Sequence, residues 1–576
     1  MSGIWVLFLY HSILGAPFVY DDLDQIVKNP HLSSFQETFR LYCLQPSAFT
    51  AQFRGIGGTN FRPLFWLSLS LDRHIWGADG AGGFHFTNIV FHWINGFLLF
   101  TLLRRICRSG DIAAATALIW LGMPINSEAV AWVSAREYIL CGFFLLLALH
   151  AAHSFLRLDR ATTTSSIIGV FGCSLAALLS HESGILLIPL MLLLAYSMGT
   201  LFKCTTAILM FPVVLSTLIF WGVRQLVGAH SGGGRSTLWA VALTFWKYVL
   251  WIVAPIHMSM QRATSTPPDS PSWEAIGALC AVFAVCMFTF ILRNKAPLFA
   301  AGVTCAIITI LPFCGIVYIY QGMAERFCYF ASVGLALTIS SLIFHHQKTM
   351  RNLASVLAIV WVGWGTWRLK SRVLDWCDPV ALYESSVEAT PDPMLYYNLG
   401  WAWRDRGDSK KALAEYKEAV RLRPNYQEAQ ASVGQMLTLT GHPKEASPSF
   451  ERALALKPED SPTRVDWAIT LEQIGDEAGA EREFRKALQY SPGNYTALND
   501  YGSLLVQEGR ADDAISYFQK AIQTNANDPN AYFNLGALFL RMGQKDKALA
   551  SFHRVLELKP DDIDTMNILA NIYAQH

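Results

Sequence analysis

A period of 34 residues governs the last third of the chain. Glycines recur at this step, and so do small residues and aromatic residues. The glycines are Gly407, Gly441, Gly475, Gly509 and Gly543; the small residues are Ala412, Ala446, Ala480, Ala514 and Ala548; the aromatics are Tyr416, Phe450, Phe484, Phe518 and Phe552; prolines fall at Pro424, Pro458, Pro492 and Pro560. A period of this length predicts one helix pair per repeat, which buries its apolar face only by stacking on its neighbours.

The pattern is that of tetratricopeptide repeats, with small residues where two helices cross, an aromatic between them and proline at the outer turn. We expect five full repeats from Pro393 to Asp562, a degenerate half-repeat before them (Asp375 to Ala389) and a closing helix after them (Ile563 to Ala574). The sixth position of each repeat lines the expected groove: Asn398, Ser432, Asp466, Asp500 and Asn534. These residues either bind a peptide backbone or are ordinary polar lining, so we assign no site residues in the repeats.

The composition before the repeats is that of a polytopic membrane protein. The whole chain is 52% hydrophobic and 15% charged, most of the charge follows residue 370, and the chain has 18 tryptophans, which favour membrane interfaces. We therefore expect an all-α chain: a membrane domain of about 11–12 spans (1–370), a linker with the half-repeat (371–392) and the repeat domain (393–576). A net charge of +1 argues against nucleic acid as a partner. The eleven cysteines lie singly, which argues against a disulfide or metal framework.

Hydropathy gives twelve candidate spans. They lie near residues 1–15, 84–103, 111–125, 138–156, 165–180, 184–200, 204–224, 237–256, 275–292, 297–317, 328–345 and 352–367. The first is short and lacks a basic flank; we interpret it as an anchor, because no small-residue cleavage pattern precedes Tyr20, and we leave open whether residues precede Met1.

Basic residues at span ends give conflicting orientations. The cluster Arg104, Arg105 and Arg108 and the pair Arg157 and Arg160 are expected on the cytoplasmic side, which places residues 16–83 outside. When the candidate spans are counted from residues 16–83 towards the C-terminus, the basic loops near Arg293 and Lys348 fall outside the cytoplasm. When they are counted back from a repeat domain outside the cytoplasm, the same loops fall inside the cytoplasm. Either one candidate between residues 160 and 275 does not span, or one span is missed, and hydropathy leaves the side of the repeats open.

Two adjacent carboxylates, Asp21 and Asp22, follow the first span in the external segment. They are either a solvated loop that caps the next helix or a general base at the membrane surface, where partial burial raises its pKa into a useful range. Arg62 follows at the start of an amphipathic stretch that ends at Trp76. It either reaches the lipid headgroups from an interfacial helix or binds a lipid phosphate with its fork of donors.

Further polar residues cluster at span ends. His85, Asn88 and His92 share one helix face, where hydrogen bonding between helices is the alternative we favour over a metal pair that lacks a third ligand. Three other groups contain ionisable residues: Asn126, Glu128, Trp132, Arg136 and Glu137; Ser180 to Gly184 with His181 and Glu182; and Ala324 to Tyr329 with Glu325 and Arg326. A single group of this kind would be interpreted as an internal ion pair. The three groups together with Asp21 and Asp22 indicate a substrate path.

The order of these motifs resembles a known family. The motifs are Phe18-Val19-Tyr20-Asp21-Asp22 with Asn29-Pro30, Arg62-Pro63-Leu64, Phe84-His85-Phe86-Thr87-Asn88 with His92, Pro124 to Trp132 with Arg136, His181-Glu182-Ser183-Gly184 and Ala324-Glu325-Arg326-Phe327, followed by the repeats. This order resembles the transmembrane and tetratricopeptide-repeat protein O-mannosyltransferases and their bacterial relatives, over nearly the whole chain.

The resemblance implies a glycosyltransferase that moves a sugar, typically mannose, from a polyprenyl or dolichyl phosphate to Ser or Thr hydroxyls of acceptor proteins outside the cytoplasm. It implies that Asp21 and Asp22 match the essential acidic position and that the repeats lie on the same side as these residues. The chain departs from the family pattern at Met123, where a histidine is expected, at Tyr138, where an acidic residue is expected and Glu137 stands one step early, and at His181, where a lysine is expected.

We therefore predict catalytic roles for Asp21 and Asp22, and substrate binding by the following residues: Arg62, His85, Glu128, Arg136, Glu182, Glu325 and Arg326. Asp22 or Asp21 accepts the proton of the attacking hydroxyl, and an arginine (Arg62, Arg136 or Arg326) neutralises the phosphate that leaves. We expect no cofactor and no metal, although two adjacent aspartates leave a divalent metal as an alternative. The partners are the lipid-linked sugar, acceptor proteins in the repeat groove and membrane lipids, in a bacterial inner membrane or the endoplasmic reticulum. A non-catalytic scaffold and a transporter of lipid-linked sugars are the competing hypotheses.

Overall fold

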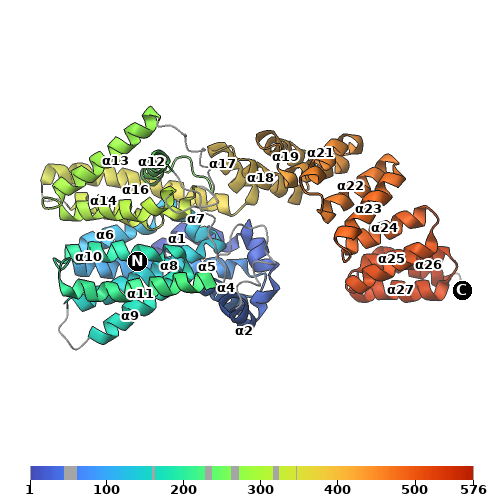
Figure 1. The fold of residues 1–576 in the computed structure, drawn as a ribbon, viewed down its shortest axis with the longest axis horizontal. Coiled ribbons are helices and arrows are strands. Elements are labelled where there is room, and N and C mark those ends of the chain that lie inside the picture. Colours follow the sequence, from blue (N-terminus) through green and yellow to red (C-terminus); the bar gives the residue numbers. More distant parts are fainter. Residues whose placement is uncertain are drawn as a thin grey trace. The chain divides into compact units, whose positions relative to one another are not determined.

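The computed structural model describes residues 2–44, 61–157, 163–226, 237–260, 272–315, 323–344 and 347–574. Arg160, one of the basic residues named above, lies outside these ranges. The chain divides between Pro391 and Asp392 into two compact units (Figure 1). Both units are built from helices, as the expected all-α class requires.

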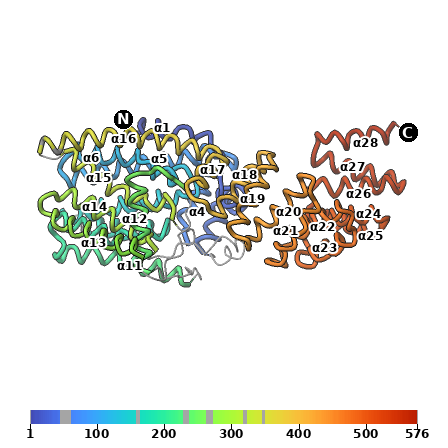
Figure 2. Tube along the Cα trace, turned by 90° about the horizontal axis from the view of Figure 1, so that it is seen from above, coloured from blue at the N-terminus to red at the C-terminus, as the bar shows by residue number. Residues whose placement is uncertain are grey.

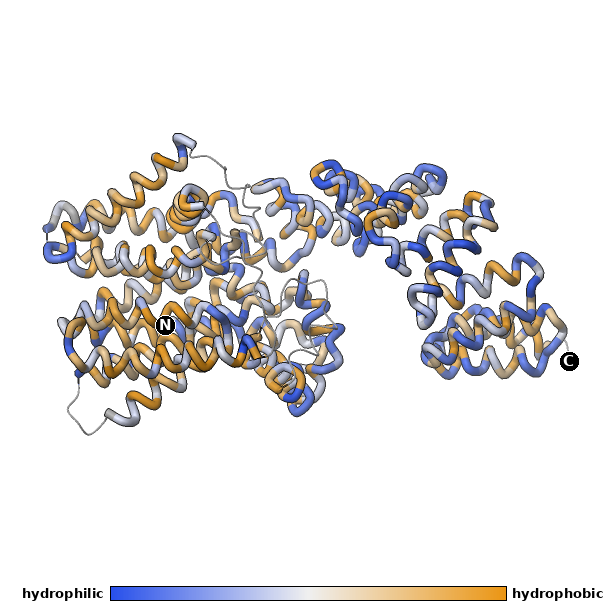
Figure 3. The backbone as a smooth tube through the Cα atoms, in the orientation of Figure 1, coloured by the Kyte–Doolittle hydropathy of each residue, from blue (hydrophilic) through white to orange (hydrophobic). Residues whose placement is uncertain are grey.

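Sixteen labelled helices build the described part of the first unit, and their apolar surfaces give it the predominantly hydrophobic colouring of Figure 3. They are α1 (Ser2–Tyr10), α2 (Phe35–Phe39), α4 (Pro63–Trp76), α5 (Ala81–Cys107), α6 (Gly110–Leu121), α7 (Ser127–Ala131), α8 (Arg136–Arg157), α9 (Thr163–Ser180), α10 (Leu187–Ser197), α11 (Cys204–Leu226), α12 (Leu238–Val253), α13 (Trp273–Leu292), α14 (Pro297–Ile310), α15 (Ala331–Ile343), α16 (Lys348–Trp376) and α17 (Pro379–Ala389).

Each of the twelve candidate spans falls on one of these helices. Among the described residues, length and composition qualify five stretches to cross a membrane: Ala81–Cys107, Val133–Arg157, Cys204–Leu226, Trp273–Leu292 and Pro297–Cys314. Shorter apolar helices account for most of the other candidates. These helices agree with a multi-pass membrane protein.

Consecutive long helices of the first unit alternate in direction. The beginning of α8 lies at the same end of the bundle as the end of α11, because Arg62 and Glu182 join α8 to Arg224 near the end of α11. We call this the acidic end, since Asp21 and Asp22 lie there. Near the end of α16, Arg372 is paired with Glu325, which directly precedes α15. The views of Figures 1 and 2 show α16 running along the bundle.

Helix α12 is the exception to this alternation. The preceding helix, α11, finishes at the acidic end, and the residues that follow α12 contact α16 and α17 there: Arg368 donates to the carbonyl of Pro255, and Ser259 donates to the carbonyl of Ser386. Figure 1 shows α12 almost end-on, whereas α14 and α16 lie lengthwise. The end of α12 therefore lies towards the acidic end, and in Figure 1 α12 runs across the direction of α14 and α16.

The second unit stacks helices in antiparallel pairs, with the pattern that the 34-residue period predicts. The helices are α18 (Pro393–Asp405), α19 (Ser409–Leu422), α20 (Gln427–Leu439), α21 (Pro443–Leu456), α22 (Ser461–Ile474), α23 (Glu477–Tyr490), α24 (Tyr495–Gln507), α25 (Ala511–Thr524), α26 (Pro529–Arg541), α27 (Lys545–Leu558) and the closing α28 (Ile563–Ala574). The recurring alanines and aromatics are all buried. The recurring glycines all have positive φ, between 75° and 88°, where glycine avoids the strain of a Cβ.

Close packing between α20 and α21 leaves no room for a side chain at Gly434. A Cβ added to Gly434 of α20 would lie 2.7 Å from a ring carbon of Phe450 on α21. We expect Gly434→Ala to destabilise the repeat unit by about 1–3 kcal/mol, because the ring has to move. Thermal unfolding of the full chain, with hydrogen exchange over α20 and α21, measures the effect. Gly493→Ala is the control, since its added Cβ meets only a methyl carbon of Thr524 at 3.9 Å; equal losses in both variants would contradict the packing argument.

Candidate active site

The acidic turn between α1 and α4 is held against the start of α8. Asp22 is fully buried, and one of its carboxylate oxygens accepts from both the hydroxyl and the backbone N–H of Ser134, the latter at 2.8 Å. Its other oxygen lies 3.5 Å from the N–H of Val19. Burial raises the pKa of Asp22 to about 6, against the effect of these donors, which lower it. The structure thus uses Asp22 to fix the turn in place.

Asp21 is the more accessible of the two carboxylates. It is partly exposed, and Gln25 donates to it at 3.4 Å. Burial, followed by the negative charge of Asp22, raises the pKa of Asp21 to about 7, while Arg326 acts in the opposite sense. A carboxylate with a pKa near neutrality is suited to accept a proton.

Tyr20 gives the turn an unusual backbone. Its φ is +54°, a conformation that is uncommon for a bulky residue and that concentrates at functional sites. The Tyr20 ring lies 5.6 Å from the ring of Trp132. The guanidinium carbon of Arg326 lies over the same Trp132 ring, 4.9 Å from its centroid. Trp132 therefore contacts both the acidic turn and Arg326.

Arg326 is bound on its other side by Glu128. The backbone N–H of Arg326 donates to one oxygen of the Glu128 carboxylate at 2.9 Å, and its guanidinium forms an ion pair with the other oxygen. Glu128 is fully buried and comes from α7, whereas Arg326 precedes α15. This pair joins two parts of the chain that are almost two hundred residues apart.

Arg62 joins two further carboxylates. Its guanidinium forms ion pairs with Glu137 of α8 and with Glu182, the latter at 2.9 Å. The second oxygen of Glu182 accepts from Arg224 of α11 at 2.7 Å. The family pattern has an acidic residue at position 138. In this chain the carboxylate that pairs with Arg62 comes from Glu137, one residue earlier. Tyr138 instead packs its ring 4.2 Å from that of His181.

Arg136 is occupied by internal partners. It is fully buried, it forms an ion pair with Asp72 of α4 at 2.6 Å, and it donates to the side chain of Asn88 at 2.7 Å. It also donates to the carbonyls of Phe84 and Ser68. The hydrogen bonds and the ion pair of the Arg136 guanidinium hold α4, α5 and α8 together. Substrate binding by Arg136 stays a prediction, and this geometry disfavours it.

Glu325 and His85 also lie inside the protein. Glu325 is fully buried between Arg372, at 3.0 Å, and the hydroxyl of Ser127, and burial raises its pKa to about 7. His85 is buried as well. Asn88 donates to the carbonyls of Val130 and Trp132, which confirms that this face of α5 serves hydrogen bonding between elements. Substrate binding by Glu325 and His85 remains a prediction.

The structure therefore places eight of the nine predicted residues in neighbouring groups of hydrogen bonds and ion pairs at the acidic end, and the ninth, His85, is buried. Four members were not assigned from sequence: Asp72, Ser134, Arg224 and Arg372. Arg224 could have been found as an arginine within an apolar helix. Within the described part of the chain, no three His, Cys, Asp or Glu side chains are arranged to hold a metal ion.

Comparisons with known proteins give two sets of matches. Tetratricopeptide-repeat family models match residues 393–426, 465–532 and 505–572. Protein O-mannosyl-transferase F38B6.6 of Caenorhabditis elegans is 24% identical over 456 residues, which are 73% of this chain and 62% of that protein. Protein O-mannosyl-transferase TMTC1 of Homo sapiens is 22% identical over 519 residues, 74% of this chain and 55% of that protein. The chain thus spans less than two thirds of the length of these relatives, and their names agree with the resemblance drawn from the motifs.

Proposed function

We propose that this chain, a relative of the transmembrane and tetratricopeptide-repeat protein O-mannosyltransferases, is itself a membrane glycosyltransferase that moves a sugar, mannose by analogy with its relatives, from a polyprenyl phosphate to Ser or Thr hydroxyls of acceptor proteins. The observation that carries the proposal is Asp21, a partly exposed carboxylate with a pKa raised to about 7, beside Asp22 and within the influence of Arg326. The relatives' names support the class of reaction.

The proposed reaction is a single displacement. The acceptor hydroxyl oxygen forms a bond to the anomeric carbon of the sugar, and its proton passes to the Asp21 carboxylate. The bond from the anomeric carbon to the phosphate oxygen breaks, and the phosphate keeps the bonding electrons. Arg326, which already acts on Asp21, neutralises the charge that develops on the phosphate. A phosphate leaves without a proton, so one carboxylate is sufficient.

The other members of the network position these two groups. Asp22 anchors the acidic turn on Ser134, and Glu128 holds Arg326 beside Trp132. Arg62 holds Glu137 and Glu182, and with them the beginning of α8 and the segment that precedes α10. We assign these groups to the support of the reacting pair.

The direction of the helices supports an external repeat domain. The α16 helix ends at the acidic end, where Arg372 binds Glu325, and α17 follows there. The chain therefore leaves the first unit on the side of Asp21. We infer that α12, which lies across the direction of α14 and α16, is the candidate between residues 160 and 275 that does not span; with this assignment forward and backward counting agree. We propose that Asp21 and the repeats share the extracytoplasmic side, so that the repeat groove can present acceptor proteins.

Reconstitution tests the proposed function. Purified full-length chain in liposomes is supplied with mannosyl-phosphoryl polyprenol and with proteins from outside the cytoplasm, and peptide mass spectrometry searches for hexose on Ser or Thr. We expect hexose with the lipid donor and none with a nucleotide sugar alone. A folded chain that transfers no sugar from the lipid donor to any acceptor would contradict the enzyme and leave a non-catalytic scaffold.

The pH profile of this transfer provides a sharper prediction. Asp21 must be deprotonated to accept a proton, so kcat/KM should rise with pH and level off above about 7, where an ordinary aspartate would already be ionised near pH 5. Asp22→Asn should move the rising limb to lower pH, because the charge of Asp22 raises the pKa of Asp21. Initial rates between roughly pH 5 and 9 at constant ionic strength measure both effects. A profile that is flat over this range would contradict the role of Asp21.

A further inference from the structure

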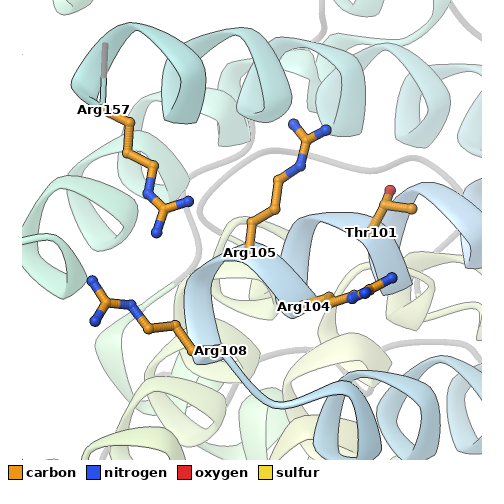
Figure 4. Close-up of a pocket in the computed structure, with 5 residues that line it drawn as sticks. All are labelled: Thr101, Arg104, Arg105, Arg108 and Arg157. Atoms are coloured by element: carbon orange, nitrogen blue, oxygen red, sulfur yellow. The ribbon is translucent and has the colours of Figure 1, made fainter.

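A pocket of about 410 Å³ lies at the end of the helix bundle that is opposite to Asp21. Four arginines and one threonine line it: Thr101, Arg104, Arg105, Arg108 and Arg157 (Figure 4). The first four belong to the end of α5 or directly follow it, and Arg157 ends α8. In Figure 4 the side chain of Arg157 reaches from α8 towards those of Arg105 and Arg108.

The pocket is far from the candidate active site. Arg136 binds the carbonyl of Phe84 near the beginning of α5, whereas the pocket lies near the end of this 27-residue helix. At 1.5 Å per residue, α5 is about 40 Å long, which is enough to cross a membrane. The arginines therefore lie at the opposite end of the bundle from Asp21, and they take no part in the proposed reaction.

The four positive charges have little to balance them. All four arginine side chains are exposed, and within the described residues no carboxylate lies within ion-pair distance of them. The ends of α5 and α8 offer only the partial negative charge of their last carbonyls. Arg108 adds a second unusual feature, since it is one of the two non-glycine residues described with positive φ, at +53°. Asp159 and Arg160, which follow α8, lie outside the described residues and have opposite charges.

An apolar surface leads along α5 to these arginines. Trp93 and Phe97 are exposed, and they precede Arg104 and Arg108 at spacings of four, seven and four residues. These spacings place Trp93, Phe97 and Arg104 on one face of α5, and Arg108 directly follows the helix. A lipid whose acyl chains lie against Trp93 and Phe97 would present its headgroup to the guanidinium groups.

We propose that this pocket binds the phosphate headgroup of an anionic lipid. Guanidinium groups form paired hydrogen bonds with phosphate oxygens, and basic pockets between membrane helices commonly hold such headgroups. A general excess of arginine on the cytoplasmic side requires only a count of charges near span ends. It does not require four of them to line one pocket between two helices, next to exposed apolar residues.

Lipid retention by the purified full-length chain tests the proposal. The chain in detergent is titrated with phosphatidic acid or phosphatidylcholine, and native mass spectrometry measures the bound fraction. We expect binding of phosphatidic acid over phosphatidylcholine, and an apparent affinity at least about tenfold lower in the double variant Arg105→Gln with Arg157→Gln. The double variant Lys203→Gln with Lys295→Gln is the matched control, because it removes two exposed charges at the same end of the bundle.

The outcomes distinguish a lipid site from general surface attraction and from a site for a soluble anion. Equal loss of phosphatidic acid in the two double variants would overturn the proposal, since it would show attraction by surface charge alone. Binding of inorganic phosphate that displaces phosphatidic acid and depends on Arg105 and Arg157 would also overturn the lipid assignment, in favour of a soluble phosphate compound. Arg104→Gln with Arg108→Gln repeats the test if the first variant fails to fold. The measurement needs no sugar transfer, so failure of the proposed glycosyltransferase function would not affect it.

Discussion

Replacing Asp21 by asparagine is expected to lower the rate of sugar transfer by about 10²–10⁴-fold, the usual contribution of a positioned general base. Asparagine retains the size of the side chain and its contact with Gln25, but it cannot accept the proton of the acceptor hydroxyl. Because Asp21 is partly exposed and makes few structural contacts, folding and membrane insertion should be unchanged. Initial rates in liposomes, together with thermal unfolding of the same preparation, measure both quantities.

Two neighbouring substitutions make this result specific. Asp24→Asn removes an exposed carboxylate three residues away, whose partner is Lys28 at 2.9 Å, and it should change the rate by no more than about threefold. Asp22→Asn should weaken the attachment to Ser134 and shift the pH profile. Full activity in Asp21→Asn with complete loss in Asp22→Asn would reverse the roles that we assign to the two carboxylates.

The parts of this protein that follow from local pattern could be predicted from sequence. The strict 34-residue period placed Tyr416 and Phe450 in the core and Gly407 and Gly441 in the turns, because each position repeats the same contact. Apolar stretches likewise marked the helices of the membrane unit. From sequence, the adjacent carboxylates after α1 are either a solvated capping loop or a general base, and the catalytic role stays a prediction.

Partners that are distant in sequence could not be predicted in this way. Asp72 lies in an amphipathic stretch with nothing to mark it as the partner of Arg136, and Arg372 lies in a long helix 47 residues after Glu325. Hydropathy also gives no direction to a helix, so it could not show that α12 lies across the direction of α14 and α16. In each case the missing information is the packing of helices against one another, which the order of residues along one helix does not contain.

Arg136→Gln is expected to destabilise the membrane unit by about 3–5 kcal/mol, because the substitution leaves the buried carboxylate of Asp72 without its ion-pair partner. Asn88 and two backbone carbonyls lose donors as well. Thermal unfolding in detergent should therefore show a clear loss. Lys28→Gln, which breaks the exposed pair with Asp24, should cost no more than about 1 kcal/mol in the same measurement.

A double variant separates this structural role of Arg136 from phosphate binding. Asp72→Asn removes the charge that Arg136 neutralises, so the stability loss of Arg136→Gln combined with Asp72→Asn should be smaller than the sum of the losses of the two single variants, by a coupling energy of about 0.5–3 kcal/mol. If Arg136 instead held the donor phosphate, Arg136→Gln would keep nearly the stability of the unsubstituted chain and raise KM for the lipid donor. The comparison is decisive because a buried ion pair acts on unfolding, whereas a phosphate ligand acts on the kinetics of transfer.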